Sequence, residues 1–187
     1  MSYQVGDKQF SQEIEEHYGR IDILVNNAGS MVERATLSEM TENVRDRVMD
    51  VNLRSVYLCS QAVLPIMKQQ GGGRIINMTS VSARDEGSPS SLAYSTAKGG
   101  VSTLTRAIAK GLVADGIRVN GVAKATSTPR STTNSPLTKR GQGRTEHSAR
   151  QGGAPKEVVD AVLFLASSQA DSVVGEIIEV NGGMLMN

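Results

Sequence analysis

Four short apolar runs, separated by stretches of helical spacing, limit the possible folds of this chain more than any other feature. The runs cover residues 21–25, 74–78, 117–122 and 176–180, and each has the length of one buried strand. Between them, apolar residues recur every three or four positions, as on one face of a helix. Because parallel strands need helical connections, this alternation predicts an α/β protein. We expect a Rossmann-like parallel sheet with helices on both faces.

The longest predicted helix covers residues 40–69. Its apolar face begins with Met40, Val44, Val48 and Val51, at spacings of three and four residues. Further helices are predicted over 10–18, 94–112 and 155–165.

Two adjacent glycines, Gly99 and Gly100, lie inside the helix predicted over 94–112. Each costs about 1 kcal/mol of helix stability relative to alanine. We therefore expect both to allow close packing against another helix, where a side chain would not fit.

The size and charge of the chain exclude several functional classes. With 187 residues, it is expected to form a single domain over 1–187. Its 20 basic and 19 acidic residues are nearly balanced, which argues against a surface built to bind nucleic acid or a membrane. The two histidines, His17 and His147, have no second ligand at a suitable spacing, so no metal site is predicted. One cysteine and the absence of a signal-peptide core favour a cytoplasmic protein.

One segment has no periodicity. Residues 124–150 are rich in Ser, Thr, Gly and Pro, and carry six basic residues against the single acid Glu146. A solvated loop is the simplest interpretation, and a substrate lid over 124–153 is the functional one. The segment lacks the aromatic residues on which bases stack, so a nucleic-acid partner is not expected.

Tyr94 and Lys98 stand four residues apart, on one face of the helix predicted over 94–112. Two unit charges about 4 Å apart interact by about 4 kcal/mol at an effective dielectric constant near 20. That interaction could lower the pKa of a phenol from about 10 toward about 7, which suits proton exchange with an alcohol or ketone. The pair alone is unspecific, because Tyr and Lys at this spacing are common on helices.

Several motifs follow one another in a fixed order and make the pair specific. They are Asn26-Asn27-Ala28-Gly29, Val51-Asn52-Leu53, Ile76-Asn77-Met78-Thr79-Ser80, Tyr94-Ser95-Thr96-Ala97-Lys98, Ile117-Arg118-Val119-Asn120 and the closing Asn181-Gly182-Gly183. From about residue 19 to 184, the chain thus resembles the short-chain dehydrogenase/reductase family, in particular its 3-oxoacyl-carrier-protein reductases.

The resemblance implies a role for each of four residues. Ser80 would donate a hydrogen bond to the substrate oxygen, and Tyr94 would give or take the proton. Lys98 would lower the pKa of Tyr94 and hold the nicotinamide ribose, and Asn52 would position a water in a proton relay. Thr79 and Ser82 are neighbouring hydroxyls, and the preference for Ser80 rests on its position in the motif. The implied cofactor is NAD or NADP, and the implied cofactor-binding residues are Asn27, Ala28, Gly29, Tyr94 and Lys98.

The sequence also departs from the family pattern. The glycine-rich turn that binds a dinucleotide is not among the 187 residues, since Gly71-Gly72-Gly73 leads into a strand rather than a helix. We therefore expect an N-terminally truncated fold, in which the strand at 21–25 lacks a neighbour. Either Ser2–Val5 or a second subunit could cover that edge. In addition, Lys124 stands where the family usually has Pro-Gly.

Two hypotheses about function follow. The first is an NAD(P)-dependent oxidoreductase that interconverts a secondary alcohol and a ketone, of the 3-oxoacyl-carrier-protein reductase or the sugar/polyol dehydrogenase type. Its substrate would be a small molecule or an acyl group on a carrier. The alternative is a non-catalytic relative with a structural or oligomerising role. In either case the resemblance implies a homodimer or homotetramer, formed through the helices over 40–69 and 94–115.

Overall fold

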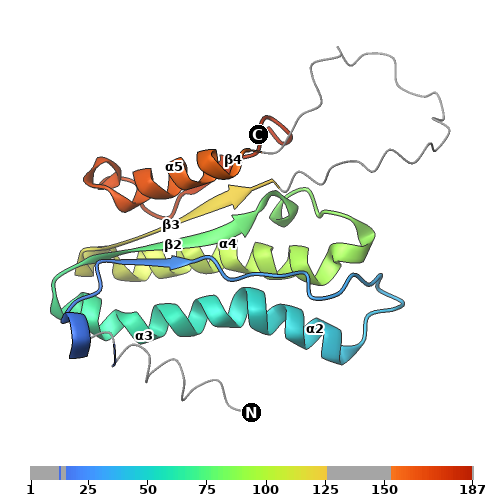
Figure 1. The fold of residues 1–187 in the computed structure, drawn as a ribbon, viewed down its shortest axis with the longest axis horizontal. Helices are drawn as coiled ribbons and strands as arrows, with labels where there is room; N and C mark the ends of the chain where they lie inside the picture. The colour runs from blue at the N-terminus through green and yellow to red at the C-terminus, as the bar shows by residue number, and fades with distance from the viewer. Residues whose placement is uncertain (1–12, 14–15, 126–152, 187) are drawn as a thin grey trace.

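A four-stranded parallel sheet forms the centre of the molecule (Figure 1). The computed structural model describes residue 13, residues 16–125 and residues 153–186. The strands, in spatial order, are β1 (Ile23–Asn26), β2 (Gly73–Ser80), β3 (Ile117–Lys124) and β4 (Ile177–Val180). All three pairings are parallel. The four apolar runs therefore form the predicted strands, and the expectation of an α/β parallel sheet is confirmed.

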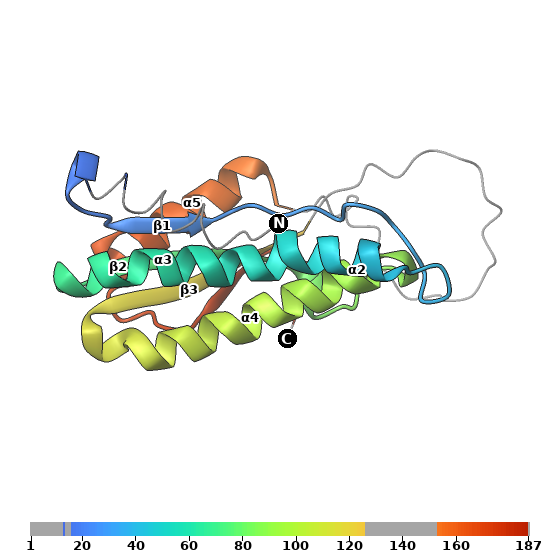
Figure 2. The same ribbon diagram turned by 90° about the horizontal axis from the view of Figure 1, so that it is seen from below.

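Helices cover both faces of this sheet (Figures 1 and 2). Helices α3 (Ser55–Gln69) and α4 (Leu92–Leu112) pack on one face, and α5 (Pro155–Ala166) packs on the other. Each face has its own apolar core, with Ile75 under the first pair and Ile76 under α5. Four short 3-10 turns complete the connections, at Val81–Ala83, Pro89–Ser91, Val113–Asp115 and Ser168–Ala170.

The long helix predicted over 40–69 is interrupted by a π-helical segment. It consists of α2 (Glu42–Met49), a π segment (Asp50–Arg54) and α3, and the Ser55 N–H donates to the carbonyl five residues earlier. The wider turn rotates the residues that follow. The prediction that Val51 lies on the buried face is therefore wrong: it is exposed, and the neighbouring Asn52 is fully buried.

Gly100 is the point at which α4 approaches the π segment. A Cβ atom at this position would lie 2.9 Å from Cδ2 of Leu53, closer than van der Waals contact allows. The expectation of close helix packing is thus confirmed for Gly100. It is wrong for Gly99, where the nearest atom to an added Cβ is 3.9 Å away.

A chain of buried amide and hydroxyl groups crosses the sheet and reaches both helices on one face. The side chain of Asn26 donates to the side-chain oxygen of Asn77 at 2.8 Å and to the hydroxyl of Ser60 at 3.2 Å. Asn77 in turn donates to the hydroxyl of Thr105 at 2.9 Å. All four residues are buried, so these hydrogen bonds satisfy groups that water cannot reach.

Strand β1 lies at the edge of the sheet as far as the described residues show. It pairs with β2, and its Ile23 and Val25 side chains are 45% and 39% exposed. Residues 2–5, one of the two expected partners for this edge, lie outside the described residues, as does most of the expected lid over 124–153. No helix in the described part of the chain combines the length and apolar character needed to cross a bilayer.

Candidate active site

The predicted catalytic residues come from three elements that meet at the carboxyl edge of the sheet. Ser80 ends β2, and Tyr94 and Lys98 lie in the first turns of α4. Asn52 lies in the π segment, which packs against α4. The carboxyl edge of a parallel sheet is the usual place for a ligand site in this fold class.

Ser80 and Tyr94 interact directly. A side-chain hydrogen bond between them acts to lower the pKa of the Tyr94 phenol. The backbone N–H of Ser82 donates to the Ser80 Oγ at 3.2 Å and orients it. The rival hydroxyl of Thr79 is used elsewhere, since it donates to the Lys98 carbonyl oxygen at 3.1 Å. This geometry favours Ser80 as the hydroxyl beside the reacting oxygen.

Tyr94 and Lys98 share one side of α4, as predicted, with the Lys98 Nζ 5.8 Å from the centre of the Tyr94 ring. The expected effect of Lys98 on Tyr94 is wrong for this structure. The pKa of Tyr94 is raised, because burial of the phenol disfavours its charged form more than the Ser80 hydrogen bond favours it. The Lys98 ammonium instead donates to a backbone carbonyl, described next.

Lys98 is almost completely buried, with 3% of its surface exposed. Its Nζ donates to the Met78 carbonyl oxygen at 2.8 Å. Burial, and to a smaller extent the positive charge of Lys124, lowers the pKa of Lys98 to about 8. The side chain can therefore change its charge near neutral pH, which an exposed lysine does not do.

Asn52 joins the π segment to the loop that follows β1. Its side-chain oxygen accepts from the Ser30 N–H at 3.1 Å, and its amide donates to the Ser30 carbonyl at 2.6 Å and to the Val48 carbonyl at 2.8 Å. The family resemblance implies a water-positioning role for Asn52. The structure shows that its side chain holds the 27–30 loop against the helix.

Gly29 lies where Asn52 and Lys98 come together. An added Cβ at Gly29 would be 3.0 Å from Oδ1 of Asn52 and 3.1 Å from Nζ of Lys98. Only a residue without a side chain leaves both groups unobstructed. Asn27 and Ala28, on the same loop, are exposed.

Lys124 ends β3 directly beside Ser80, which is its Cα partner on β2. This lysine departs from the family pattern, and it was not among the predicted site residues. Its charge reaches Lys98, so it belongs to the electrostatic environment of the site. Only the strand register, which links residues 44 positions apart, places it there.

A match to a family model identifies the family of this chain. A model described as enoyl-(acyl carrier protein) reductase matches residues 7–185. The chain belongs to the short-chain dehydrogenase/reductase family. As a member, it is an oxidoreductase that acts on CH–OH groups, and the family cofactor is NAD or NADP.

Individual short-chain dehydrogenases/reductases agree with this assignment. The chain is 36% identical over 179 residues to a 3-oxoacyl-[acyl-carrier-protein] reductase from Thermotoga maritima, covering 96% of this chain and 72% of that protein. It is also 36% identical to a 3alpha-hydroxysteroid dehydrogenase from Mediterraneibacter gnavus, covering 91% and 67%. Among solved structures, an NADH-dependent reductase complexed with NAD superposes with a TM-score of 0.81 at 27% identity, covering 98% of this chain and 72% of that one.

The residues around Gly29 fit the nicotinamide half of such a cofactor. The absence of a side chain at Gly29 leaves space beside the Lys98 ammonium and the Asn52 side-chain oxygen. The 27–29 loop follows the carboxyl end of β1, where a ribose can approach the backbone closely. Among the described residues, no group of three or more His, Cys, Asp or Glu side chains could hold a metal ion.

Proposed function

We propose that the chain reduces a 3-oxoacyl group to the corresponding hydroxyacyl group, or performs the reverse reaction, with Ser80, Tyr94, Lys98 and Asn52 as its working residues. The observation that carries this proposal is the convergence of all four at one edge of the sheet. The printed names of several relatives, among them the Thermotoga maritima reductase, support the carrier-linked 3-oxoacyl substrate. A small sugar, polyol or alicyclic alcohol is the second candidate, supported by relatives named for such substrates.

Ser80 and Tyr94 would act on the substrate oxygen. Hydride addition to a carbonyl builds negative charge on that oxygen, and a positioned hydroxyl donor is worth about 3–4 kcal/mol there. The raised pKa of Tyr94 keeps the phenol protonated, which suits its use as the acid in the reduction direction. A bound nicotinamide would supply or accept the hydride.

Lys98 and Asn52 would act on the surroundings of the reacting atoms. The Lys98 Nζ lies beside Gly29, where it can donate to a ribose hydroxyl. The pKa of about 8 lets Lys98 return a proton to the site after Tyr94 has given one up. Asn52 would keep the loop in place so that these distances persist.

A combined binding and turnover experiment tests the proposal. The purified chain is titrated with NADH and NADPH, with nucleotide fluorescence as the signal because the chain has no tryptophan. Turnover is then measured with acetoacetyl-carrier protein and acetoacetyl-coenzyme A in the presence of NADH or NADPH, and with ribitol in the presence of NAD+ or NADP+. Faster turnover of the two acetoacetyl thioesters supports the 3-oxoacyl assignment, and faster ribitol oxidation favours the second candidate. A folded chain that binds neither nucleotide would favour the non-catalytic alternative.

Two further expectations remain predictions. A homodimer or homotetramer is expected through the helical segments over 40–69 and 94–115, where the large Tyr57 side chain is 53% exposed. The native mass in solution, from light scattering, tests this expectation. The second expectation is a cytoplasmic location, which can be tested by localising the tagged chain in cells.

A further inference from the structure

A second polar site lies at the amino edge of the sheet, at the opposite end of the strands from Ser80. It is a hollow of about 450 Å³. Its charged lining consists of three arginines (Arg20, Arg74, Arg118) and two aspartates (Asp22, Asp171), a net charge of +1. Ser80 lies six positions after Arg74 along β2, about 20 Å away at 3.3 Å per residue. The hollow is therefore separate from the site described above.

Arg74 and Arg118 are direct neighbours on β2 and β3, where they are Cα partners. They share one acidic residue. Arg74 forms an ion pair with the Asp171 carboxylate, while the Arg118 Nε donates to the Asp171 backbone carbonyl at 2.8 Å. The Nη1 atoms of both arginines are buried, and neither has a hydrogen-bond partner. Two adjacent guanidinium groups are thus accompanied by a single carboxylate, that of Asp171, and the Nη1 atom of each lacks a hydrogen-bond partner.

Such an arrangement is unfavourable on its own. A buried donor without a partner costs about 1–3 kcal/mol, and two like charges on adjacent strands repel each other. An arginine cannot reduce this cost by releasing its proton, because its pKa is too high. An anion held in the hollow by the two guanidinium groups would offset their mutual repulsion, since it brings negative charge.

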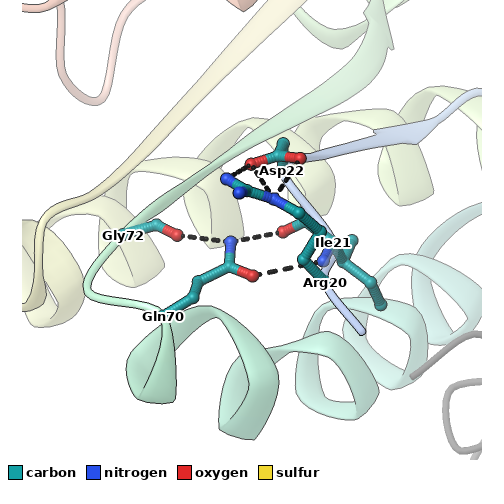
Figure 3. A network of polar contacts seen from close by, with 5 residues as sticks. All are labelled: Arg20, Ile21, Asp22, Gln70 and Gly72. Atoms are coloured by element: carbon teal, nitrogen blue, oxygen red, sulfur yellow. Dashed lines mark hydrogen bonds and ion pairs between the residues drawn. The ribbon is translucent and has the colours of Figure 1, made fainter. Parts of the chain in front are cut away.

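The floor of the hollow is held in place by backbone contacts and one glutamine (Figure 3). The Gln70 amide donates to the carbonyls of Ile21 and Gly72, and its oxygen accepts from the Ile21 N–H. An added Cβ at Gly72 would lie 2.9 Å from the Gly116 carbonyl oxygen, so the two glycine loops fit closely together. Figure 3 also shows Arg20 bound by the Asp22 carboxylate.

We propose that this hollow binds a small phosphate-bearing anion through the guanidinium groups of Arg74 and Arg118. Planar guanidinium groups match the oxygens of a phosphate in a two-point contact, which explains the choice of arginine over lysine. The volume exceeds that of one phosphate ion and falls in the range of small-ligand pockets. Inorganic phosphate and a phosphate ester offer the same recognised group. This proposal does not depend on the proposed function.

An NMR titration of the full chain tests the proposal. The arginine Nε–Hε signals are followed as inorganic phosphate, ribose 5-phosphate or ribose is added at constant ionic strength. Saturable shifts of the Arg74 and Arg118 signals are expected with both phosphates, and none with ribose. Tighter binding of ribose 5-phosphate identifies a phosphate ester as the favoured ligand, and equal binding identifies the free oxyanion.

Three variants connect the binding to these side chains. Arg118→Met should weaken phosphate binding at least tenfold, and the control Arg106→Met, which removes an exposed arginine of α4, should not change it. Asp171→Asn removes the competing carboxylate and should tighten binding several-fold. Should Arg118→Met not fold, Arg118→Lys keeps the charge but loses the two-point contact, and should still bind more weakly. Linear, non-saturating shifts, or equal binding by Arg118→Met and Arg106→Met, would overturn the proposal.

Discussion

The two edges of the sheet each place a fully or partly buried positive charge next to a neighbour of the same sign, but they use different residues. At the carboxyl edge, Lys98 is buried near Lys124 and donates to a backbone carbonyl. At the amino edge, Arg74 and Arg118 lie side by side and share Asp171. Burial and repulsion act on both pairs.

The difference lies in how each residue type responds. Burial lowers the pKa of Lys98 to about 8, so this residue can exist without its charge. The arginines keep their charge at every accessible pH. At the carboxyl edge, Lys98 can therefore exchange a proton, as proton-transfer catalysis requires. At the amino edge, the arginines keep a permanent charge, which favours the binding of an anion.

The largest expected effect tests whether the carboxyl edge performs the chemistry. Tyr94→Phe removes the proton donor and should lower kcat by about 10²–10⁴-fold. Nucleotide binding should change little, because the ring and Lys98 remain. The control is Tyr57→Phe, which removes a phenol from an exposed position on α3. If Tyr94→Phe and Tyr57→Phe have equal kcat, the assignment of the proton to Tyr94 is wrong.

The second prediction concerns the pH dependence of stability that Lys98 confers. Its pKa in the folded chain, about 8, lies below the ordinary value of 10.5, so the folded state loses this proton first as pH rises. The buried charge destabilises the fold below pH 8, and this penalty disappears between about pH 8 and 10.5. Linkage converts the difference into about 3 kcal/mol, to order of magnitude.

Urea unfolding of the wild type and of Lys98→Met, at several pH values from 7 to 10.5, measures this effect. The wild type should gain stability relative to Lys98→Met as the pH rises. Lys110→Met, which removes an exposed lysine of α4, serves as the control and should follow the wild type. A constant difference between wild type and Lys98→Met over this range would show that Lys98 keeps its charge as the arginines do.

The sequence predicted much of the fold because local patterns determine it. The four apolar runs became strands, and the spacing of Tyr94 and Lys98 placed both on one side of α4. The π segment was missed, since no local pattern marks it. Its effect is visible only in the exposure of Val51 and the burial of Asn52.

Features that depend on contacts between distant residues could not be predicted. The pKa of Tyr94 rises because of burial, which a spacing rule does not measure. Arg74 and Arg118 lie in separate strands, and only the register of β2 and β3 makes them neighbours. The adjacency of Lys124 to Ser80 has the same origin. One signal in the sequence could have pointed to these residues: each is a charged residue in a strand whose other residues are mostly apolar and buried.

The third prediction tests a region between the two edges, where buried polar groups are fully paired. Asn77 is completely buried and bonds to Asn26 and Thr105. Asn77→Ala removes one hydrogen bond from each of these buried partners and should lower the free energy of unfolding by about 2–3 kcal/mol. Asn27→Ala, at an exposed position one residue beyond Asn26, should change it by less than about 0.5 kcal/mol. Equal effects of the two substitutions in urea unfolding would mean that these hydrogen bonds add nothing to stability.

The smallest expected effect separates the two causes of the low pKa of Lys98. Burial is the larger cause and the charge of Lys124 is the smaller, so Lys124→Met should raise the pKa of Lys98 only part of the way toward 10.5. The pKa can be measured from the NMR signal of ¹³C-dimethylated Lys98 over a pH series, with Lys110→Met as the matched control. An unchanged pKa would show that Lys124 does not act on Lys98. A higher pKa of Lys98 in Lys124→Met would show that repulsion from Lys124 favours the uncharged form of Lys98. Arginine side chains such as Arg74 and Arg118 cannot respond in this way.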